Sequence, residues 1–215
     1  MTVLDRIAYF QNQRDEVPNQ QLARQLAETN DETGIREIAE NLWNRNPNIQ
    51  SDCLKVLYET GYIQPELIVP YIEGFLRLLK SKNNRMVWGA MIALSTIAHL
   101  QSGRLFAEVE TLKTAIQSGS VITTDAGIKT LSIVAASSPE RCRSIFPYLL
   151  SHLQTCRPVD LPRHAEQALP ALNDEFRPGF LAILQARLTD LGAAQAARVR
   201  KVIKQASQFS PDHLE

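Results

Sequence analysis

The sequence is short of cysteine and has no surplus of charge of either sign. Its three cysteines, Cys53, Cys142 and Cys156, are odd in number and scattered, which argues against a disulfide framework. We expect them to be small buried hydrophobic residues of a protein in a reducing compartment. The 23 basic and 23 acidic residues give zero net charge, which argues against a dedicated nucleic-acid or membrane-surface protein.

Motifs for catalysis, cofactors and metals are also missing. The nine glycines are dispersed and form no phosphate-binding loop, and no serine lies in a Gly-x-Ser-x-Gly context. The histidines show neither pairing at four residues nor the His-Glu spacing of a zinc helix. We expect each to be a surface or boundary residue: His99, His152, His164 and His213. The sequence therefore predicts a protein that is not an enzyme and has no cofactor and no metal site.

Targeting and membrane signals are absent as well. The N-terminal stretch MTVLDRIAYFQNQ contains Asp5 and lacks the apolar region of a signal peptide. The most apolar run, residues 84–100, is short for a membrane span and is bracketed by Arg85 and His99. We therefore expect a cytoplasmic protein.

The run at 84–100 has the pattern of a buried helix. Apolar residues three and four positions apart form one broad stripe: Met86, Val87, Ala90, Met91, Ala93, Leu94, Ile97 and Ala98. Trp88 and Ile92 lie on the other side, so the polar face is thin. A helix that is apolar nearly all round is normally flanked on most sides, which places this helix at the centre of a soluble core.

The central run is repeated along the chain. A shift of 37 residues in either direction aligns Leu94 with Leu57 and with Leu131, and a further 38 residues aligns Leu131 with Leu169. Small residues recur in the same register, as expected where helices approach closely: Cys53, Ala90, Gly127 and Ala165. A repeat of this length built from two helices predicts a solenoid, because one helix pair cannot bury its apolar face alone.

These units resemble HEAT repeats, which are helical hairpins stacked into a right-handed superhelix. The resemblance is carried by prolines that lead a first helix and by the Val-x-x-Ala-x-x-x-Leu core of a second helix: Pro70, Pro147, Val87, Ala90 and Leu94. Trp88 departs from the family pattern, in which arginine commonly follows that valine. The resemblance implies an all-α fold, a right-handed α-α superhelix of the HEAT or armadillo type with about six antiparallel hairpins.

Twelve helices are expected, with no strand. They cover residues 3–13, 18–28, 31–43, 47–61, 67–81, 84–100, 102–118, 123–136, 139–154, 163–172, 174–191 and 193–208. Expected boundary residues are the caps Asp31, Asn83 or Asn84, Thr124 or Asp125, and Ser138, and the terminators Gly103 and Gly192. We expect one domain over residues 1–209 and a frayed tail over 210–215.

The repeat register also indicates a candidate binding surface. If second helices line the concave wall, Trp88 and Ile92 form an apolar centre flanked by lysines, which is typical of a hot spot with a polar rim. The candidate partner-binding residues are Trp88, Ile92, Lys55, Lys129, Asp125 and Arg163. Alternatively, Trp88 and Ile92 simply fill the gap between neighbouring second helices.

Two classes of function remain. The first is a non-enzymatic scaffold that binds a peptide or protein partner on its concave face, or through a dimer interface. The second is a HEAT-like DNA-alkylation glycosylase, a family that places aromatic residues and an aspartate in a basic concave groove. In that family the key carboxylate follows a tryptophan by four residues, whereas here Ile92 follows Trp88. The lack of a basic surplus also disfavours a nucleic-acid partner.

Overall fold

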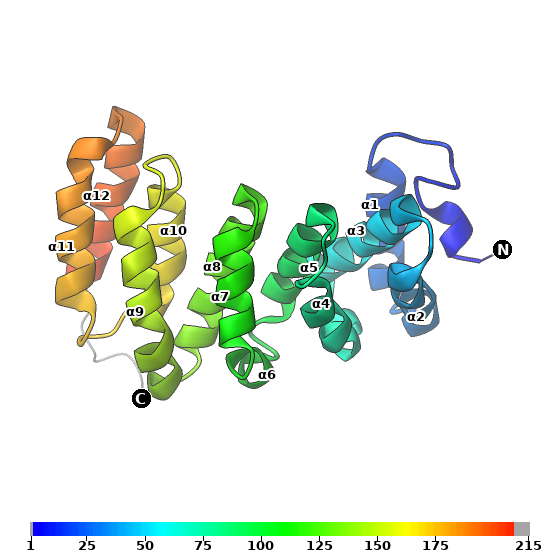
Figure 1. Cartoon of the computed structure of the whole chain (residues 1–215), viewed down its shortest axis with the longest axis horizontal. Helices are drawn as coiled ribbons and strands as arrows, with labels where there is room; N and C mark the ends of the chain where they lie inside the picture. The colour runs from blue at the N-terminus through cyan, green and yellow to red at the C-terminus, as the bar shows by residue number, and fades with distance from the viewer. Residues whose placement is uncertain (1, 209–215) are drawn as a thin grey trace. The chain divides into compact units, whose positions relative to one another are not determined.

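The computed structural model describes residues 2–208, and every regular element in that range is helical. The α-helices are α1 (Val17–Glu28), α2 (Glu32–Glu40), α3 (Pro47–Ile63), α4 (Ile72–Leu78), α5 (Asn84–Ile97), α6 (Ser102–Phe106), α7 (Val109–Ser118), α8 (Val121–Ala136), α9 (Pro139–Thr155), α10 (Leu161–Ala168), α11 (Arg177–Arg187) and α12 (Ala193–Ser207). The 3-10 helices are η1 (Leu4–Arg6), η2 (Asn41–Trp43), η3 (Pro65–Tyr71), η4 (Leu169–Ala171) and η5 (Leu188–Asp190). The all-α prediction is confirmed (Figure 1). The expected frayed tail at 210–215 and His213 lie outside the described residues.

The chain forms two compact units. The N-terminal unit is Met1–Thr130 and the C-terminal unit is Leu131–Glu215, with the boundary inside α8. A single domain over residues 1–209 stays a prediction. In residues 2–208, no helix combines the length and the apolar character that crossing a membrane requires.

In the N-terminal unit, helical hairpins stack in two layers. Helix α3 packs against α2, and α5 packs against α4 and η3. The second helices α1, α3 and α5 contact one another in succession, while α2 contacts η3 in the other layer (Figure 1). Each hairpin thereby buries the apolar face that it cannot cover by itself.

The core of this unit follows the 37-residue repeat. The repeated leucines and small residues of α3 and α5 are all fully buried: Cys53, Leu57, Ala90 and Leu94. Gly61 extends the close approach, because a Cβ atom at this position would lie 2.3 Å from the Oγ1 atom of Thr96. A Cβ at Gly127 would lie 2.3 Å from Cγ1 of Ile116. The prediction that small residues mark close helix approaches is confirmed at Gly127.

The C-terminal unit contains two hairpins, α9–α10 and α11–α12. The first helices α9 and α11 contact each other, and so do the second helices α10 and α12 (Figure 1). Its aromatic core centres on Phe146, whose ring centroid lies 5.1 Å from that of Phe176 and 6.2 Å from that of Phe180. Ala165 is fully buried on α10, at the small-residue position of the repeat.

Arg187 of α11 closes the end of α9. Its Nη1 atom donates to the carbonyl oxygens of Leu153 at 2.8 Å and Gln154 at 3.1 Å, and its Nη2 atom donates to that of Cys156 at 2.9 Å. Its Nε atom donates to Asp190 at 2.6 Å. The carbonyl groups in the last turn of an α-helix have no intrahelical donors. Here one guanidinium from the next hairpin provides the missing hydrogen-bond donors.

The prediction of a helix at residues 3–13 is wrong. Only Leu4–Arg6 is helical, as a 3-10 turn, and Asn12 has a φ of 52°. Backbone N–H groups of this segment donate hydrogen bonds to side chains of later elements. Val3 and Leu4 donate to Glu37, Ala8 donates to Asn19, and Tyr9 donates to Asp52. The N–H groups of Ala8 and Tyr9 therefore have tertiary partners in place of the intrahelical hydrogen bonds that the apolar pattern predicted.

Three of the expected caps are confirmed. Asp31 accepts from the Gly34 N–H at 2.8 Å, Asn83 from that of Arg85 at 3.0 Å, and Ser138 from that of Arg141 at 3.2 Å. The start of α8 was placed too late at 123. The helix begins at Val121, and the Ser120 hydroxyl, rather than Thr124 or Asp125, accepts a first-turn N–H.

The expected glycine terminators are also wrong. Gly103 lies inside α6, and Gly192 precedes α12 with a φ of −68°. The residue that ends a helix in the left-handed region is Asn30, with a φ of 50°, and the following Asp31 N–H donates to the carbonyl of Leu26. Asparagine tolerates this conformation better than most residues that carry a side chain.

Neither proline of the repeat pattern leads its helix. Pro70 lies inside η3 and Pro147 inside α9, whereas Pro65 and Pro139 occupy the first positions of these elements. A proline at a first position costs no hydrogen bond, but an interior proline removes one. Around Pro70 the backbone is 3-10 rather than α-helical, so the segment expected as one helix at 67–81 consists of η3 followed by α4.

Candidate functional site

An aromatic row lies on α3 and α5 of the N-terminal unit. Trp88 of α5 is half-buried, and its ring centroid lies 6.1 Å from that of Tyr58 on α3. Tyr58 in turn packs edge-to-face on Tyr62, at 6.4 Å between centroids. Tyr58 is buried, whereas Tyr62 is 56% exposed. Tyr58, Tyr62 and Trp88 form the aromatic row, which presents Tyr62 and part of Trp88 to solvent.

Two lysines contact this row. The Nζ atom of Lys55 lies 4.8 Å from the ring centroid of Tyr58, and that of Lys129 on α8 lies 5.8 Å from the ring centroid of Tyr62. At these distances an ammonium group is attracted to the negative face of an aromatic ring. The structure thus brings together three of the residues predicted from the repeat register: Trp88, Lys55 and Lys129.

Lys55 lies beneath the surface rather than on an open rim. It is 8% exposed, and its Nζ atom pairs with Glu16 at 2.9 Å and with Glu59 at 2.5 Å. Burial alone would lower the pKa of the ammonium group, but hydrogen bonds to Glu59, Tyr58 and Glu16 raise it above its usual value. Lys55 is therefore a charged support for Tyr58, and Lys129 is the more accessible of the two lysines.

The tyrosines of the row remain neutral at physiological pH. Burial raises the pKa of Tyr58 to about 12, although the hydrogen bond from Lys55 opposes the rise. Burial also raises the pKa of Tyr62, with a further contribution from the charge of Glu59. The row is therefore an uncharged aromatic surface next to one accessible cation.

The other predicted residues are placed as follows. Ile92 is half-buried on α5, one turn after Trp88, and Asp125 is half-buried on α8. Arg163 is exposed on α10 and belongs to the C-terminal unit. Trp88 and Ile92 are thus partly covered and partly exposed, and both alternatives for them, groove residue or helix-packing residue, stay predictions.

Neither Tyr58 nor Tyr62 is among the predicted binding residues, and Tyr62 is the exposed one of the two. It follows Lys55 and Tyr58 at helical spacing and continues their face of α3. In the repeat register its equivalent on the next unit is His99, so the register carries no aromatic signal there. The helical spacing within α3 could have found it.

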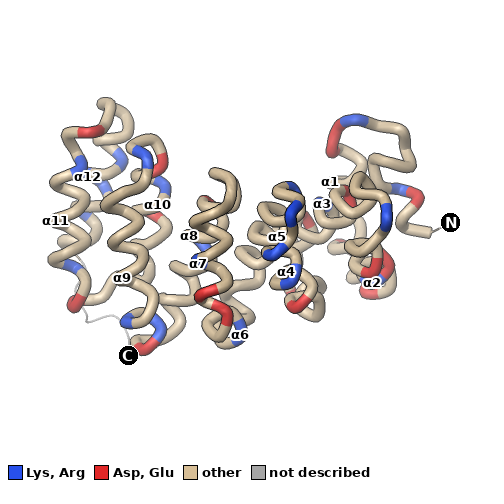
Figure 2. Tube along the Cα trace, viewed as in Figure 1, with Lys and Arg blue, Asp and Glu red and all other residues tan. Residues whose placement is uncertain are grey.

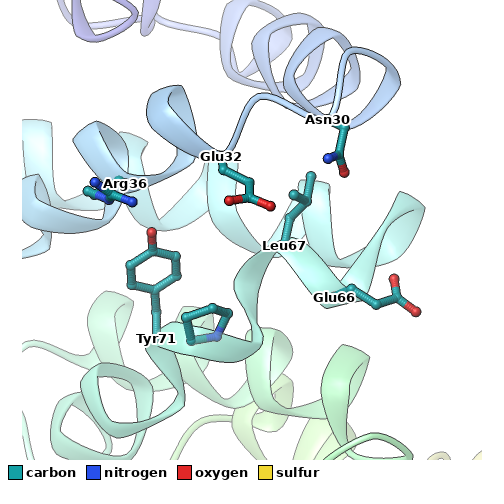
Figure 3. Close-up of a pocket in the computed structure, with 7 residues that line it drawn as sticks. Asn30, Glu32, Arg36, Glu66, Leu67 and Tyr71 are labelled. Carbon is teal, nitrogen blue, oxygen red and sulfur yellow. The ribbon is translucent and has the colours of Figure 1, made fainter.

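A separate cavity of about 480 Å³ lies between α2 and η3. Figure 3 shows the Tyr71 hydroxyl pointing toward Arg36, with Glu32 and Leu67 beside it. The cavity is lined by Asn30, Glu32, Arg36, Glu66, Leu67, Pro70 and Tyr71. This lining holds charges of both signs but no serine, cysteine or histidine, so it contains no Ser–His or Cys–His pair.

No protein-family model and no curated protein matches the chain. Solved structures are similar to it, and three of them are as follows. An engineered protein is 19% identical with a TM-score of 0.64, covering 96% of this chain and 98% of its own. A designed armadillo repeat protein in complex with the peptide (KR)4 is 14% identical with a TM-score of 0.64, and the match covers 87% of this chain and 85% of that one. A computationally designed armadillo repeat protein for modular peptide recognition is 14% identical with a TM-score of 0.63, and the match covers 95% of this chain and 98% of that one. The chain therefore has a HEAT- or armadillo-like helical repeat fold, an α solenoid.

Proposed function

We propose that the chain is a binding scaffold that takes up a peptide segment of a protein partner on the face formed by α3, α5 and α8. The observation that carries this proposal is the aromatic row with Lys129 beside it. Exposed aromatic rings supported by buried neighbours are typical of the residues that dominate binding energy at interfaces. This face belongs to the second helices, which the repeat predicts to line the concave side.

The side chains on the face formed by α3, α5 and α8 indicate which peptide side chains would bind there. Tyr62 and Trp88 offer rings against which an aliphatic or aromatic side chain can pack. Lys129 offers a positive charge next to Tyr62, which fits a carboxylate adjacent to that side chain. The designed armadillo repeat protein crystallised with the basic peptide (KR)4 supports peptide binding by this fold, while the sign of the preferred charge is set by each protein's own side chains.

The two tryptophans provide a matched test. We expect Trp88→Ala to lower the affinity for peptides selected from a random-sequence library by 10-fold or more, measured by titration calorimetry. We expect the free energy of unfolding to fall by less than about 1 kcal/mol, because partly exposed positions usually tolerate substitution. Lys129→Glu should act in the same direction on acidic peptides.

Trp43→Ala is the control. Trp43 is 44% exposed in the same unit and packs against Arg77, whose Cζ atom lies 4.2 Å from the ring. The proposal expects this variant to bind the selected peptides normally. Equal binding by Trp88→Ala and the wild type, or a large loss of stability in Trp88→Ala, would show that Trp88 only packs the helices.

Double-stranded DNA should bind weakly or not at all at physiological salt. Figure 2 shows basic and acidic positions interspersed along the helices of each unit. The last helix, α12, carries four basic residues, Arg198, Arg200, Lys201 and Lys204. Arg198 is paired with Glu166 at 2.6 Å. Because DNA affinity comes chiefly from phosphate neutralisation, a fluorescence-anisotropy titration should show no sub-micromolar binding. Tight, steeply salt-dependent binding would instead favour the glycosylase alternative.

The remaining expectations about partners are part of this proposal. The partner is a protein or peptide, and a second copy of the chain is the alternative occupant. A cytoplasmic location stays a prediction. Sedimentation of the purified chain across a concentration series separates the two occupants, since self-association would be seen without any added peptide.

A further inference from the structure

Three side chains of types that bind metal ions converge in the C-terminal unit, and none of them belongs to the aromatic row. His152 and Cys156 lie four residues apart at the end of α9, so they face the same side of the helix. His164 comes from α10 and is buried. One ligand atom from each residue lies within 4.8 Å of the other two.

The distances are close to those of a metal site. The Nε2 atom of His152 and the Nδ1 atom of His164 lie 2.9 Å apart. Around a tetrahedral zinc ion, bonds of about 2.0–2.3 Å place neighbouring ligand atoms roughly 3.3–3.7 Å apart. An ion would therefore fit if the two imidazoles separate by a few tenths of an ångström and the sulfur moves inward by about 1 Å.

We propose that His152 Nε2, Cys156 Sγ and His164 Nδ1 bind a zinc ion. Imidazole and thiolate are ligands that zinc prefers, and three protein ligands leave a fourth position for water or an external ligand. Copper in a His₂Cys site of the electron-transfer type uses a weak axial methionine. The hairpin that carries these residues, α9–α10, contains no methionine, so zinc is the better match.

The environment is compatible with an ion that displaces the thiol proton. Zinc forms a bond to Sγ, and the thiol proton passes to solvent. The neighbouring charges are compensated: Arg187 pairs with Asp190 at 2.6 Å, and Arg157 pairs with Asp160 at 2.6 Å.

The ion would link the two helices of one hairpin. His152 lies in the last turn of α9, Cys156 is the C-cap residue that follows this helix, and His164 lies on α10. The proline-containing connector at residues 157–160 separates the first two ligands from the third. A ligand that binds the folded state alone stabilises it in proportion to the logarithm of its concentration. The expected consequence is a zinc-dependent rise in the melting temperature.

The test uses the full chain without an affinity tag, reduced and freed of metal by chelation. Cobalt(II) is added as a spectroscopic probe. We expect one equivalent to give the visible absorption of tetrahedral cobalt and a thiolate-to-cobalt charge-transfer band, and equimolar zinc to abolish both. Zinc alone should raise the melting temperature of the wild type.

Variants locate the site. Cys156→Ser should remove the charge-transfer band. His152→Gln, at a half-buried position, should weaken cobalt binding by roughly 100-fold or more. This loss is larger than the usual effect of removing a residue that only hydrogen-bonds to a metal ligand. Cys142→Ser alters a buried cysteine of the same unit whose Sγ contacts the Ala171 carbonyl at 3.2 Å, and it should bind cobalt like the wild type. His99→Gln, at an exposed histidine, should do the same.

The proposal fails if one equivalent of cobalt gives no tetrahedral spectrum in the folded wild type. It also fails if Cys156→Ser and His152→Gln retain the spectrum, or if the control variants lose it while remaining folded by circular dichroism. This outcome is independent of the peptide-binding proposal, because the metal test involves none of the residues of the aromatic row.

Discussion

Leu94→Ala is expected to lower the free energy of unfolding by about 2–5 kcal/mol, because the substitution removes buried methyl groups and leaves a cavity. Leu94 is fully buried on α5 and occupies the leucine position of the repeat. Helix α5 packs against α3, α4 and η3, so little backbone can move to fill the space. Chemical denaturation followed by circular dichroism measures the loss.

Leu100→Ala is the matched control for this change. Leu100 follows α5 and is 38% exposed, so the same truncation should change stability by no more than about 0.5 kcal/mol. Equal losses in the two variants would contradict the assignment of Leu94 to the repeat core.

Phe146→Ala should destabilise the C-terminal unit by about 3–5 kcal/mol. Phe146 is fully buried and its ring stacks on Phe176, with an interplanar angle of 20°. Truncation removes both the buried area and the contacts with Phe176 and Phe180, and aromatic pairs contribute beyond their area. Differential scanning calorimetry of the full chain measures the effect.

Phe10→Ala, at a position that is 47% exposed in the N-terminal unit, is the control and should leave the melt nearly unchanged. Calorimetry of these variants also tests the predicted single domain. If the chain unfolds as one domain, Leu94→Ala and Phe146→Ala each shift the whole transition. If each variant shifts a different part of the heat-capacity curve, the two compact units unfold separately and the single-domain prediction is wrong.

The repeat could be predicted because its determinants are local and periodic. Leu57 and Leu94 recur at one spacing and face the same core, and polar caps such as Asp31 and Ser138 lie next to the helices that they start. These signals depend on a few neighbouring residues, so they can be detected without knowing the tertiary contacts.

The errors arose where distant residues decide the conformation. The N-terminal segment has a helical apolar pattern, but Asn19 and Asp52 accept its backbone N–H groups from α1 and α3. Lys55 was expected on the rim because its position is polar in the register, but Glu16 and Glu59 hold it beneath Tyr58. Nothing in the local pattern indicates that Glu16, 39 residues earlier, would be its partner.

The candidate metal cluster shows a different kind of omission. The histidines were compared with one another, and His152 has no histidine four residues away. Its partner at that spacing is Cys156, which was treated only as a small hydrophobic residue. A search for mixed histidine and cysteine ligands on one helix face would have found this pair, but only the fold brings in His164.

Because Arg187 caps the end of α9, the α9–α10 hairpin depends on the α11–α12 hairpin for hydrogen-bond donors. A chain cut after Leu172 would keep every residue of α9 yet lose the guanidinium that holds the carbonyls of Leu153, Gln154 and Cys156. Lysine could not replace it, since a single ammonium group lacks the planar fork that reaches three acceptors at once. Ending this protein at Leu172 would therefore require a new arginine, or a glycine stop, at the end of α9.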